Sequence, residues 1–271
     1  MIPIEQIPAL NFRQLHEEGL LVLVNVWDAG TARLIESLGA KAIATSSAAV
    51  AWSHGYADGD LLPVPKLLAT VEEIVRVVSV PVTVDIEGGY STEPDDVADV
   101  VAGVMQAGVV GINLEDGANS PDLLSTKIER AKETAQRLGM DLFVNARTDA
   151  YLRPLVPSDR RVEETIAREE RYRGAGADGI FVPGVTDAKE IQEIASAAQL
   201  PLNVLARPGL PPAAELEQLG VRRLSTGSWI AQAVYGKIST LASNFLKDGA
   251  SSPLAEGSIV YARINELIES R

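Results

Sequence analysis

The sequence predicts an α/β protein of the (β/α)8 TIM-type barrel class, with an extra C-terminal helix. Eight short apolar runs recur along the chain, and a segment with helical spacing of apolar residues follows each of them. Apolar runs without alternation, each trailed by a helix, are typical of parallel strands that are covered by helices. The length of 271 residues suits one such barrel. A doubly wound open sheet is the alternative, but no G-x-G-x-x-G phosphate fingerprint follows the first run.

The eight runs are the elements that we expect to form the barrel wall. In chain order they are LLVLVNV (20–26), KAIATS (41–46), PVTVDI (81–86), VVGINLE (109–115), DLFVNAR (141–147), DGIFVPG (178–184), PLNVLA (201–206) and VRRLSTG (221–227). Five of them follow a glycine placed as a helix C-cap, which repeats the same helix–glycine–strand joint. These glycines are Gly39, Gly108, Gly139, Gly176 and Gly220.

The chain shows no change of composition and no linker, so we expect one barrel domain over residues 1–271 with a helical extension over 253–271. The extension restarts after Pro253 and carries an apolar stripe. The stripe consists of Ile259, Val260, Ile264, Leu267 and Ile268. Two alternatives stay open, because such a helix could pack under its own barrel or dock on a neighbouring subunit.

Composition narrows the range of partners. The net charge of -13 argues against nucleic acid and anionic membranes as partners. The absence of cysteine excludes disulfides, zinc–thiolate sites and a cysteine nucleophile. The N-terminal sequence MIPIEQIPALNFRQ has no signal-peptide pattern, and no apolar run approaches the ~20 residues of a membrane span. We therefore expect a soluble cytoplasmic protein.

Polar residues at the strand ends are the candidates for function, because barrel enzymes place their catalytic residues at the carboxyl ends of the strands. Asp85 and Glu87 are two residues apart and point the same way in an extended chain. Glu115 ends the next run. Such clustered carboxylates would repel one another unless a cation lay among them, and oxygen ligands select a hard ion such as Mg²⁺. The glycines at 88–89 would let the backbone pass close to that ion. The alternative for Asp85 and Glu87 is helix capping.

The remaining strand ends carry further polar residues. They are Asn25, Asp28, Thr45, Ser46, Ser47, Asp116, Asn145, Arg147, Asp149, Asn203, Ser225 and Thr226. Arg147 suits a substrate carboxylate or phosphate because its fork binds two oxygens. An ion pair with a strand-end acid is the alternative. We expect both histidines, His16 and His54, to be solvated, and spacing alone gives Asp58 no role.

These motifs together resemble those of the isocitrate lyase/phosphoenolpyruvate mutase superfamily, from about Asn25 to Val234. The motifs that carry the resemblance are NVWDAGTARLIESLGAKAIATSS, GYADGD, VDIEGGYS, GINLEDG, NARTDAYL, GADGIFVPG and PLNVLARPG, in this order. Members of this superfamily bind 2-oxo acids, and make or break the bond next to the carbon alpha to the carbonyl.

The resemblance implies roles for individual residues. Asp85 matches the direct Mg²⁺ ligand, with Mn²⁺ as a possible replacement ion. The acids that match positions holding the ion, largely through its waters, are Asp58, Glu87 and Glu115. Ser46 and Ser47 match a turn whose backbone amides contact the substrate carboxylate, and Arg147 matches a substrate-binding arginine. We also expect Asn203 and Tyr90 to bind substrate. Arg147, Asp58 and Glu115 are the expected catalytic residues.

The loop after the fourth strand departs from the family pattern. Isocitrate and methylisocitrate lyases carry a catalytic cysteine there, whereas GANSPDLLS (117–125) contains no cysteine, lysine or histidine. Phosphonate-processing members use a lysine and an asparagine in this loop and a tryptophan at the end of the second strand. Here the loop keeps Asn119, and Ala44 occupies the tryptophan position. Lys127 lies beyond the loop and is predicted to be a surface residue.

We therefore predict a Mg²⁺-dependent carbon–carbon lyase of a small 2-oxo acid that acts through a metal-stabilised enolate and resembles oxaloacetate decarboxylase. Three alternatives stay open. They are a P–C bond enzyme of the phosphoenolpyruvate mutase or phosphonopyruvate hydrolase type, a catalytically weak 2-oxo acid binder, and a phospho-sugar enzyme with a phosphate site at STGS (225–228). The apolar stripe, and the family's exchange of a terminal helix between subunits, predict a homo-oligomer, most simply a tetramer.

Overall fold

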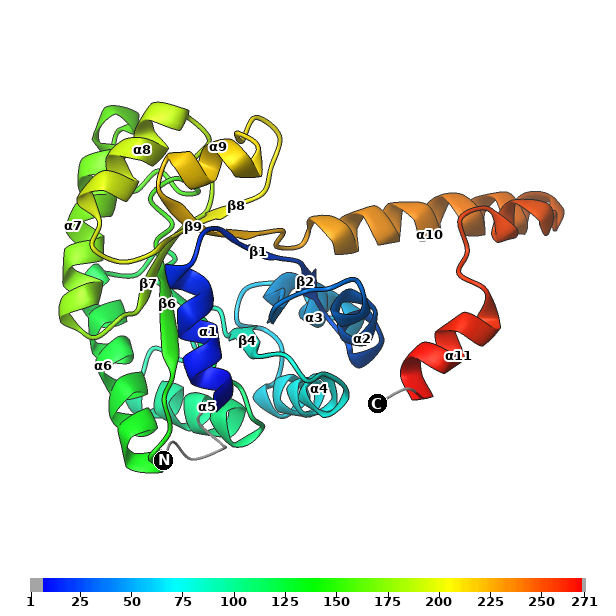
Figure 1. Cartoon of the computed structure of the whole chain (residues 1–271), viewed down its shortest axis with the longest axis horizontal. Helices are drawn as coiled ribbons and strands as arrows, with labels where there is room; N and C mark the ends of the chain where they lie inside the picture. The colour runs from blue at the N-terminus through cyan, green and yellow to red at the C-terminus, as the bar shows by residue number, and fades with distance from the viewer. Residues whose placement is uncertain (1–6, 270–271) are drawn as a thin grey trace.

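A computed structural model describes residues 7–269 and shows a parallel β-barrel surrounded by helices (Figure 1). Within these residues one sheet runs in the order β1-β9-β8-β7-β6-β5-β4-β3-β2. The strands are β1 (Leu21–Leu23), β2 (Asn25–Val26), β3 (Ile43–Thr45), β4 (Val82–Asp85), β5 (Gly111–Glu115), β6 (Phe143–Arg147), β7 (Gly179–Val182), β8 (Leu202–Leu205) and β9 (Val221–Ser225). Each lies within one of the eight predicted runs, so the (β/α)8 prediction is confirmed.

The first predicted run forms two strands instead of one. β1 pairs with β9, and β2 pairs with β3. Only Val24 lies between them. The chain thus changes its neighbour within this run, and this short break is the point at which the barrel closes.

Helices connect the strands, and most of them cover the outside of the barrel. They are α1 (Ile7–Glu17), α2 (Ala29–Ser37), α3 (Ser47–Ser53), α4 (Val64–Val77), α5 (Pro94–Gln106), α6 (Pro121–Leu138), α7 (Arg161–Gly174), α8 (Ala188–Ala197), α9 (Ala213–Gln218), α10 (Trp229–Asp248) and α11 (Tyr261–Glu269). All five glycines predicted as C-caps have positive φ, between 67° and 102°. A left-handed residue after the last turn ends a helix at little cost when it is glycine.

Helix α1 closes the amino-terminal end of the barrel. Phe12 is fully buried there, and its ring meets the edge of Phe143, at the start of β6, with centroids 5.4 Å apart. The His16 ring stacks on Phe143 at 4.2 Å, and His16 is only 3% exposed. The prediction that His16 lies on the surface was therefore wrong. The stacking partner is distant in sequence, and the charged residues next to His16 give no sign of it.

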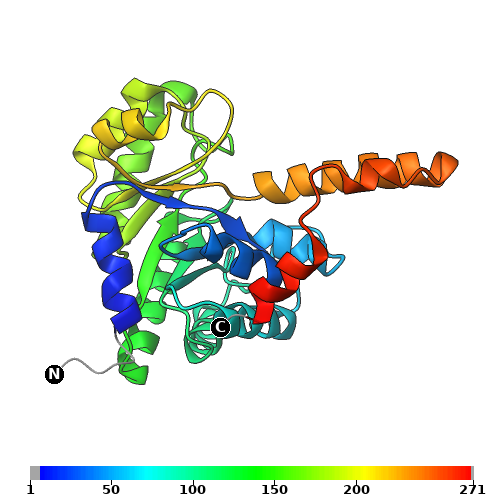
Figure 2. The ribbon, with the colours of Figure 1, turned by 45° about the vertical axis from the view of Figure 1, so that its right-hand side comes forward.

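Helix α10 extends away from the barrel instead of packing on it (Figures 1 and 2). Ala231 is its one buried residue among those described. The large apolar side chains exposed along it are Trp229, Val234, Tyr235, Ile238, Phe245 and Leu246. Helix α10 thus leaves the barrel ahead of the predicted extension, residues 253–271. Helix α11 then turns back and contacts α2, while Ile264 and Ile268 in its apolar stripe stay exposed.

No helix within residues 7–269 combines the length and the apolar character that crossing a membrane requires.

Candidate active site

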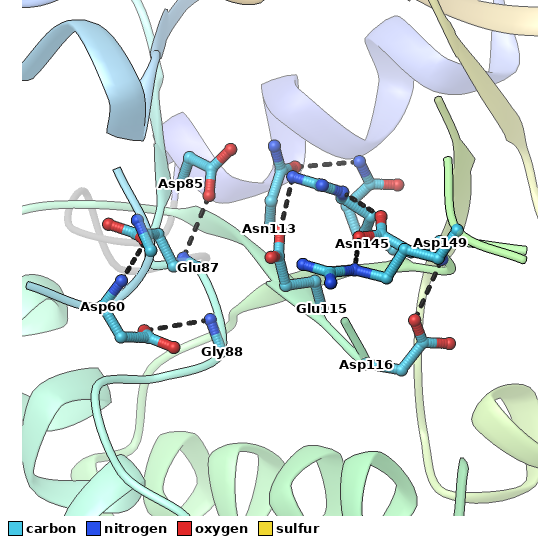
Figure 3. A network of polar contacts seen from close by, with 12 residues as sticks. Asp60, Asp85, Glu87, Gly88, Asn113, Glu115, Asp116, Asn145 and Asp149 are labelled. Atoms are coloured by element: carbon cyan, nitrogen blue, oxygen red, sulfur yellow. Dashed lines mark hydrogen bonds and ion pairs between the residues drawn. The ribbon is translucent and has the colours of Figure 1, made fainter. Parts of the chain in front are cut away.

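The carboxyl ends of β4 and β5 bring acidic side chains together (Figure 3). Asp85 is the last residue of β4 and is buried. Its Oδ1 accepts a hydrogen bond from the Glu87 amide at 3.0 Å. Glu115 ends β5, and its amide donates to the Glu87 carbonyl at 3.0 Å. The parallel register of β4 and β5 therefore places the three predicted acids at one rim of the barrel.

The turn after β4 runs through left-handed backbone conformations. Glu87 has φ 53° and Tyr90 has φ 62°, both unusual for residues other than glycine. At Gly88 a Cβ atom would lie 2.7 Å from Oδ2 of Asp60, and at Gly89 it would lie 2.8 Å from the γ carbons of Val97. The two glycines therefore let the turn pass close to the side chains of Asp60 and Val97.

The loop after α3 docks onto this turn. The Glu87 carboxylate accepts hydrogen bonds from the amides of Gly59, at 2.7 Å, and of Asp60. Asp60 in turn accepts from the amides of Gly88 at 3.2 Å and Tyr90 at 3.0 Å. Sequence reasoning missed Asp60, although the D-G-D pattern that it shares with Asp58 offered a signal.

Lys127 holds the same turn from the other side. Its Nζ donates to the Gly88 carbonyl at 2.6 Å, and the residue is only 2% exposed. Burial lowers the pKa of Lys127, and the nearby Asp60 carboxylate opposes this shift. The prediction of a surface lysine was wrong, because the acceptor is a backbone carbonyl that no sequence pattern reveals.

Arg147 lies between two carboxylates at the end of β6. Its Nη1 forms an ion pair with Glu115, and its Nε donates to Oδ1 of Asp149 at 2.8 Å. Burial lowers the pKa of Arg147, but the carboxylates of Glu115, Asp149 and Asp85 outweigh burial, so the pKa is raised. The ion pair considered as the alternative is present in the structure, and the substrate-binding role of Arg147 stays a prediction.

The acids at this rim hold protons more tightly than free carboxylic acids do. Burial raises the pKa of Glu87 to about 7 and that of Glu115 to about 8. Burial also raises the pKa of Asp85 and of Asp58, and in both cases the Arg147 guanidinium opposes the shift. Repulsion from neighbouring carboxylates adds to the shifts of all four acids, and for Asp58 that neighbour is Asp60. A cation among these oxygens would relieve that repulsion, so the donor set fits a hard divalent ion.

The spacing of the acids limits how they could hold such an ion. Among residues 7–269 no group of three or more histidine, aspartate or glutamate side chains converges closely enough to ligate one ion directly. Mg²⁺ commonly keeps several waters and takes only one or two carboxylates directly. The arrangement therefore fits an ion with one direct carboxylate ligand and further acids bound through water.

The predicted substrate-binding residues lie at different depths. Ser46 caps α3, and Ser47 begins it; both are buried at the end of β3. The Tyr90 hydroxyl donates to Oε1 of Glu87 at 3.3 Å. Asn203 is fully buried inside the barrel, where its Nδ2 donates to Oγ of Ser225 at 3.2 Å. Asn203 thus belongs to the barrel interior, and its role as a substrate ligand stays a prediction.

A polar layer inside the barrel was not predicted as a unit. Oδ1 of Asn113 accepts from Nδ2 of Asn145 at 2.9 Å and from Nη2 of Arg223 at 3.3 Å. Arg223 is 1% exposed, and burial lowers its pKa to about 10. The Asn113 side chain also hydrogen-bonds to Asp85, so this layer supports the acidic rim from below.

The loop after β5 is shorter than the sequence suggested. Ser120 caps α6, which begins at Pro121, so the connection between strand and helix spans only residues 116–120. The second half of the predicted lid is the first turn of this helix. His54, predicted to be solvated, is exposed and bonds to Oγ1 of Thr70 at 2.9 Å.

Comparison with known proteins agrees with this geometry. A family model described as phosphoenolpyruvate phosphomutase matches residues 12–246. An uncharacterised protein of Mycobacterium tuberculosis is 38% identical over 221 residues, 81% of this chain and 82% of the relative. An oxaloacetate decarboxylase of Pseudomonas savastanoi pv. phaseolicola is 30% identical over 213 residues, 73% of this chain and 70% of the relative.

Solved structures show the same barrel. The structure of 2,3-dimethylmalate lyase, a member of the PEP mutase/isocitrate lyase superfamily, is 25% identical with a TM-score of 0.84, and the match covers 97% of this chain and 93% of that one. Because the family match runs through every strand of the barrel and includes the acidic rim, the chain is an enzyme that belongs to the isocitrate lyase/phosphoenolpyruvate mutase superfamily of lyases and mutases.

Proposed function

We propose that the protein is a Mg²⁺-dependent lyase that decarboxylates oxaloacetate or a closely related 4-carboxy-2-oxo acid. The observation that carries the proposal is the meeting of Asp85, Glu87 and Glu115 with Arg147 at the rim of the barrel. Similarity to an oxaloacetate decarboxylase supports the choice of substrate class.

Four acids would hold the ion. Asp85 is the proposed direct ligand, and Asp58, Glu87 and Glu115 would bind its waters. When bound, the ion supplies Lewis-acid stabilisation of negative charge on substrate oxygens. Mn²⁺ offers the same coordination chemistry and would replace Mg²⁺ in this role.

The chain's own residues would bind and orient the substrate. Arg147 would hold the substrate carboxylate that lies next to the keto group, because its planar fork can donate two parallel hydrogen bonds. The backbone amides at Ser46 and Ser47, where α3 begins, would bind the carboxylate next to the keto group. These contacts would leave the distal carboxylate free to leave as CO₂.

Decarboxylation fits a site whose loop after β5 offers no cysteine, lysine or histidine as a proton donor. When the C3–C4 bond breaks, its electron pair moves toward the keto oxygen, CO₂ departs, and C3 later takes a proton from water. Isocitrate-type cleavage instead needs a positioned proton donor, which is worth ~10²–10⁴ in rate. Residues 116–120 contain no cysteine, lysine or histidine, and Lys127 is engaged with the Gly88 carbonyl.

The test is a substrate screen with purified protein and Mg²⁺, measuring pyruvate release. We expect release from oxaloacetate well above the rate with free Mg²⁺, and near-background rates with isocitrate, methylisocitrate and phosphonopyruvate. Arg147→Ala should lose most of the enhancement. Arg130→Ala, which removes an exposed arginine paired with Glu133, should not. An oxaloacetate rate equal to that of the metal alone, or efficient isocitrate cleavage, would overturn the proposal.

A P–C bond enzyme is the second candidate, because the matching family model is described as phosphoenolpyruvate phosphomutase. The phosphonopyruvate arm of the screen separates the two, because a P–C bond enzyme would turn this compound over. The short loop after β5 should admit water, which disfavours reactive phosphoryl intermediates. A catalytically weak 2-oxo acid binder would instead show thermal stabilisation by 2-oxo acids with Mg²⁺ and no turnover.

We also propose that the chain works as a homo-oligomer, most simply a tetramer. The apolar side chains along α10 support this proposal, because a solvated helix does not normally present so many large apolar residues. Val22 of β1 is also half exposed on the barrel wall, where an outer helix would ordinarily cover a strand.

A further inference from the structure

We infer that Asp116 is a positioning residue for Arg147. It ties the loop after β6 to helix α7, so that Asp149 holds the Arg147 guanidinium in one orientation. The inference rests on the proposed function, in which Arg147 binds a substrate carboxylate. Neither the sequence motifs nor the mechanism above assigns Asp116 a role.

Asp116 follows Glu115 at the end of β5 and is 1% exposed. Its Oδ2 accepts hydrogen bonds from Nη1 of Arg168 at 2.7 Å and from the Tyr172 hydroxyl at 2.6 Å. Both donors belong to α7 and are four residues apart, so they lie on one face of that helix. The buried carboxylate is thus compensated by one charged and one neutral donor.

The second oxygen of Asp116 reaches the loop after β6. Oδ1 accepts from the Asp149 amide at 2.9 Å (Figure 3), and the Asp116 amide donates to the Arg147 carbonyl at 3.1 Å. Asp116 therefore bonds to the backbone on both sides of Thr148. The Asp116 carboxylate thus links Asp149 to α7, while the Asp116 amide links Arg147 to the end of β5.

Asp149 links Asp116 to the Arg147 guanidinium. Its side chain is 2% exposed; Oδ1 accepts from Nε of Arg147 at 2.8 Å, and Oδ2 accepts from Nε of Arg153 at 3.2 Å. The Glu115 carboxylate holds Nη1 of Arg147. Neither contact uses Nη2, so the two carboxylates fix the plane of the fork and leave an edge of it for a ligand.

The three hydrogen-bond donors around the Asp116 side chain require a carboxylate at position 116. Three donors converge on it, and an amide would turn an NH₂ group toward at least one of them. Burial raises the pKa of Tyr172 and the Asp116 carboxylate raises it further, so the Tyr172 hydroxyl keeps its proton and remains a donor. Asp116→Asn should therefore loosen the loop that carries Asp149, and with it the orientation of Arg147.

The experiment compares Asp116→Asn and Tyr172→Phe with a matched control, Asp178→Asn. Asp178 is a partly buried carboxylate that likewise accepts from an arginine, a lysine and a backbone amide, at 2.8, 2.9 and 2.8 Å. It precedes β7, at the opposite end of the barrel. The readouts are the melting temperature, Mg²⁺ affinity by calorimetry, oxalate affinity in the presence of Mg²⁺, and kcat and KM for oxaloacetate.

We expect Asp116→Asn to weaken oxalate binding and raise the oxaloacetate KM by about tenfold or more, because a small misplacement of a binding group has effects of this size or larger. Its Mg²⁺ affinity should stay within about twofold of wild type, since Asp85 and Glu87 keep their hydrogen bonds to backbone amides. Tyr172→Phe keeps two of the three donors and should shift oxalate affinity in the same direction by about fivefold, which matches one neutral hydrogen bond. Asp178→Asn should lower the melting temperature and leave oxalate binding unchanged.

A further readout separates failure of this inference from failure of the proposed function. Hydrogen exchange at Nε–H of Arg147, followed by NMR, needs no substrate. We expect slow exchange in wild type and in Asp178→Asn, and clearly faster exchange in Asp116→Asn. Unchanged exchange in Asp116→Asn, or an equal loss of oxalate binding in Asp178→Asn, would overturn the positioning role. A wild type that shows the exchange pattern but neither binds oxalate nor releases pyruvate would overturn the proposed function alone.

Discussion

At the scale of single residues, burial disfavours the charged forms of the acids at the rim of the barrel. The pKa of Glu87 is raised to about 7 and that of Glu115 to about 8, and burial is the largest cause for both. Both values exceed those of the unfolded chain, so between pH 4.5 and 8 the folded protein holds protons that the unfolded chain releases. The contribution of these groups to stability is therefore lost as the pH rises through that range.

Binding of Mg²⁺ should offset this loss of stability at high pH, so the pH dependence of stabilisation by Mg²⁺ has a predictable sign. The ion binds deprotonated carboxylates, so it must displace more protons from Glu87 and Glu115 at pH 6 than at pH 8. We expect the rise in melting temperature on adding Mg²⁺ to be larger at pH 8 than at pH 6. Differential scanning fluorimetry at both pH values measures it.

Two variants make this metal test specific. Asp85→Asn should abolish the Mg²⁺-induced shift at both pH values while the barrel stays folded. Asp122→Asn removes an exposed acid paired with Arg171 and should keep the shift. A shift of equal size at the two pH values, or one that persists in Asp85→Asn, would contradict the assigned metal site.

At the scale of elements, α1 is held to the barrel by a buried histidine. Nδ1 of His16 lies 2.8 Å from the Phe12 carbonyl, which can only accept, so Nδ1 carries the proton of the neutral ring. Burial lowers the pKa of His16 to about 3, and the Arg223 guanidinium lowers it as well. The closure of the barrel by α1 therefore depends on an uncharged ring.

The sign of the pH dependence follows from this lowered pKa. Between about pH 6.5 and 3 the unfolded chain binds a proton at His16 and the folded chain does not, so stability falls as the pH falls, by about 1.4 kcal/mol per pH unit. His16→Leu should remove this component and flatten the loss of stability between pH 6.5 and 5, above the range in which most carboxylates titrate. Urea unfolding of both proteins at several pH values measures the difference. Parallel curves for the two proteins would show that His16 is not buried in its neutral form.

At the scale of the whole molecule, the protein is a barrel with a long arm. Helix α10 presents large apolar side chains to solvent along its length, and α11 returns from its far end to contact α2 (Figures 1 and 2). Exposed apolar surface on this scale marks a site of association. A partner subunit is the proposed occupant of that surface.

This proposal predicts a mass that is a multiple of 28.8 kDa in light scattering. Ile238→Glu combined with Phe245→Glu should shift the protein to smaller species, because it places two charges on one apolar face of α10. Ser243→Glu adds one charge to an exposed polar position of the same helix and should leave the mass unchanged. A monomer mass for wild type at micromolar concentration would end the proposal.

The sequence alone determined the barrel and grouped the candidate site residues at one end of it. Runs such as LLVLVNV (20–26) are almost continuously apolar, and each glycine joint ends a helix locally, so both patterns depend on near neighbours in the chain. Parallel topology then places every strand end on one rim. For that reason Asp85, Glu87, Glu115 and Arg147 could be grouped without a structure.

Only the tertiary structure decided which isolated polar residues are buried and where the last barrel helix goes. Lys127 and His16 looked like surface residues because their partners, the Gly88 carbonyl and the Phe143 ring, are distant in sequence. The sequence of α10 reads like that of a helix covering its own barrel, and periodicity does not reveal whether an apolar face meets its own chain or another. Burial arises from contacts between distant segments, so only the folded chain specifies it.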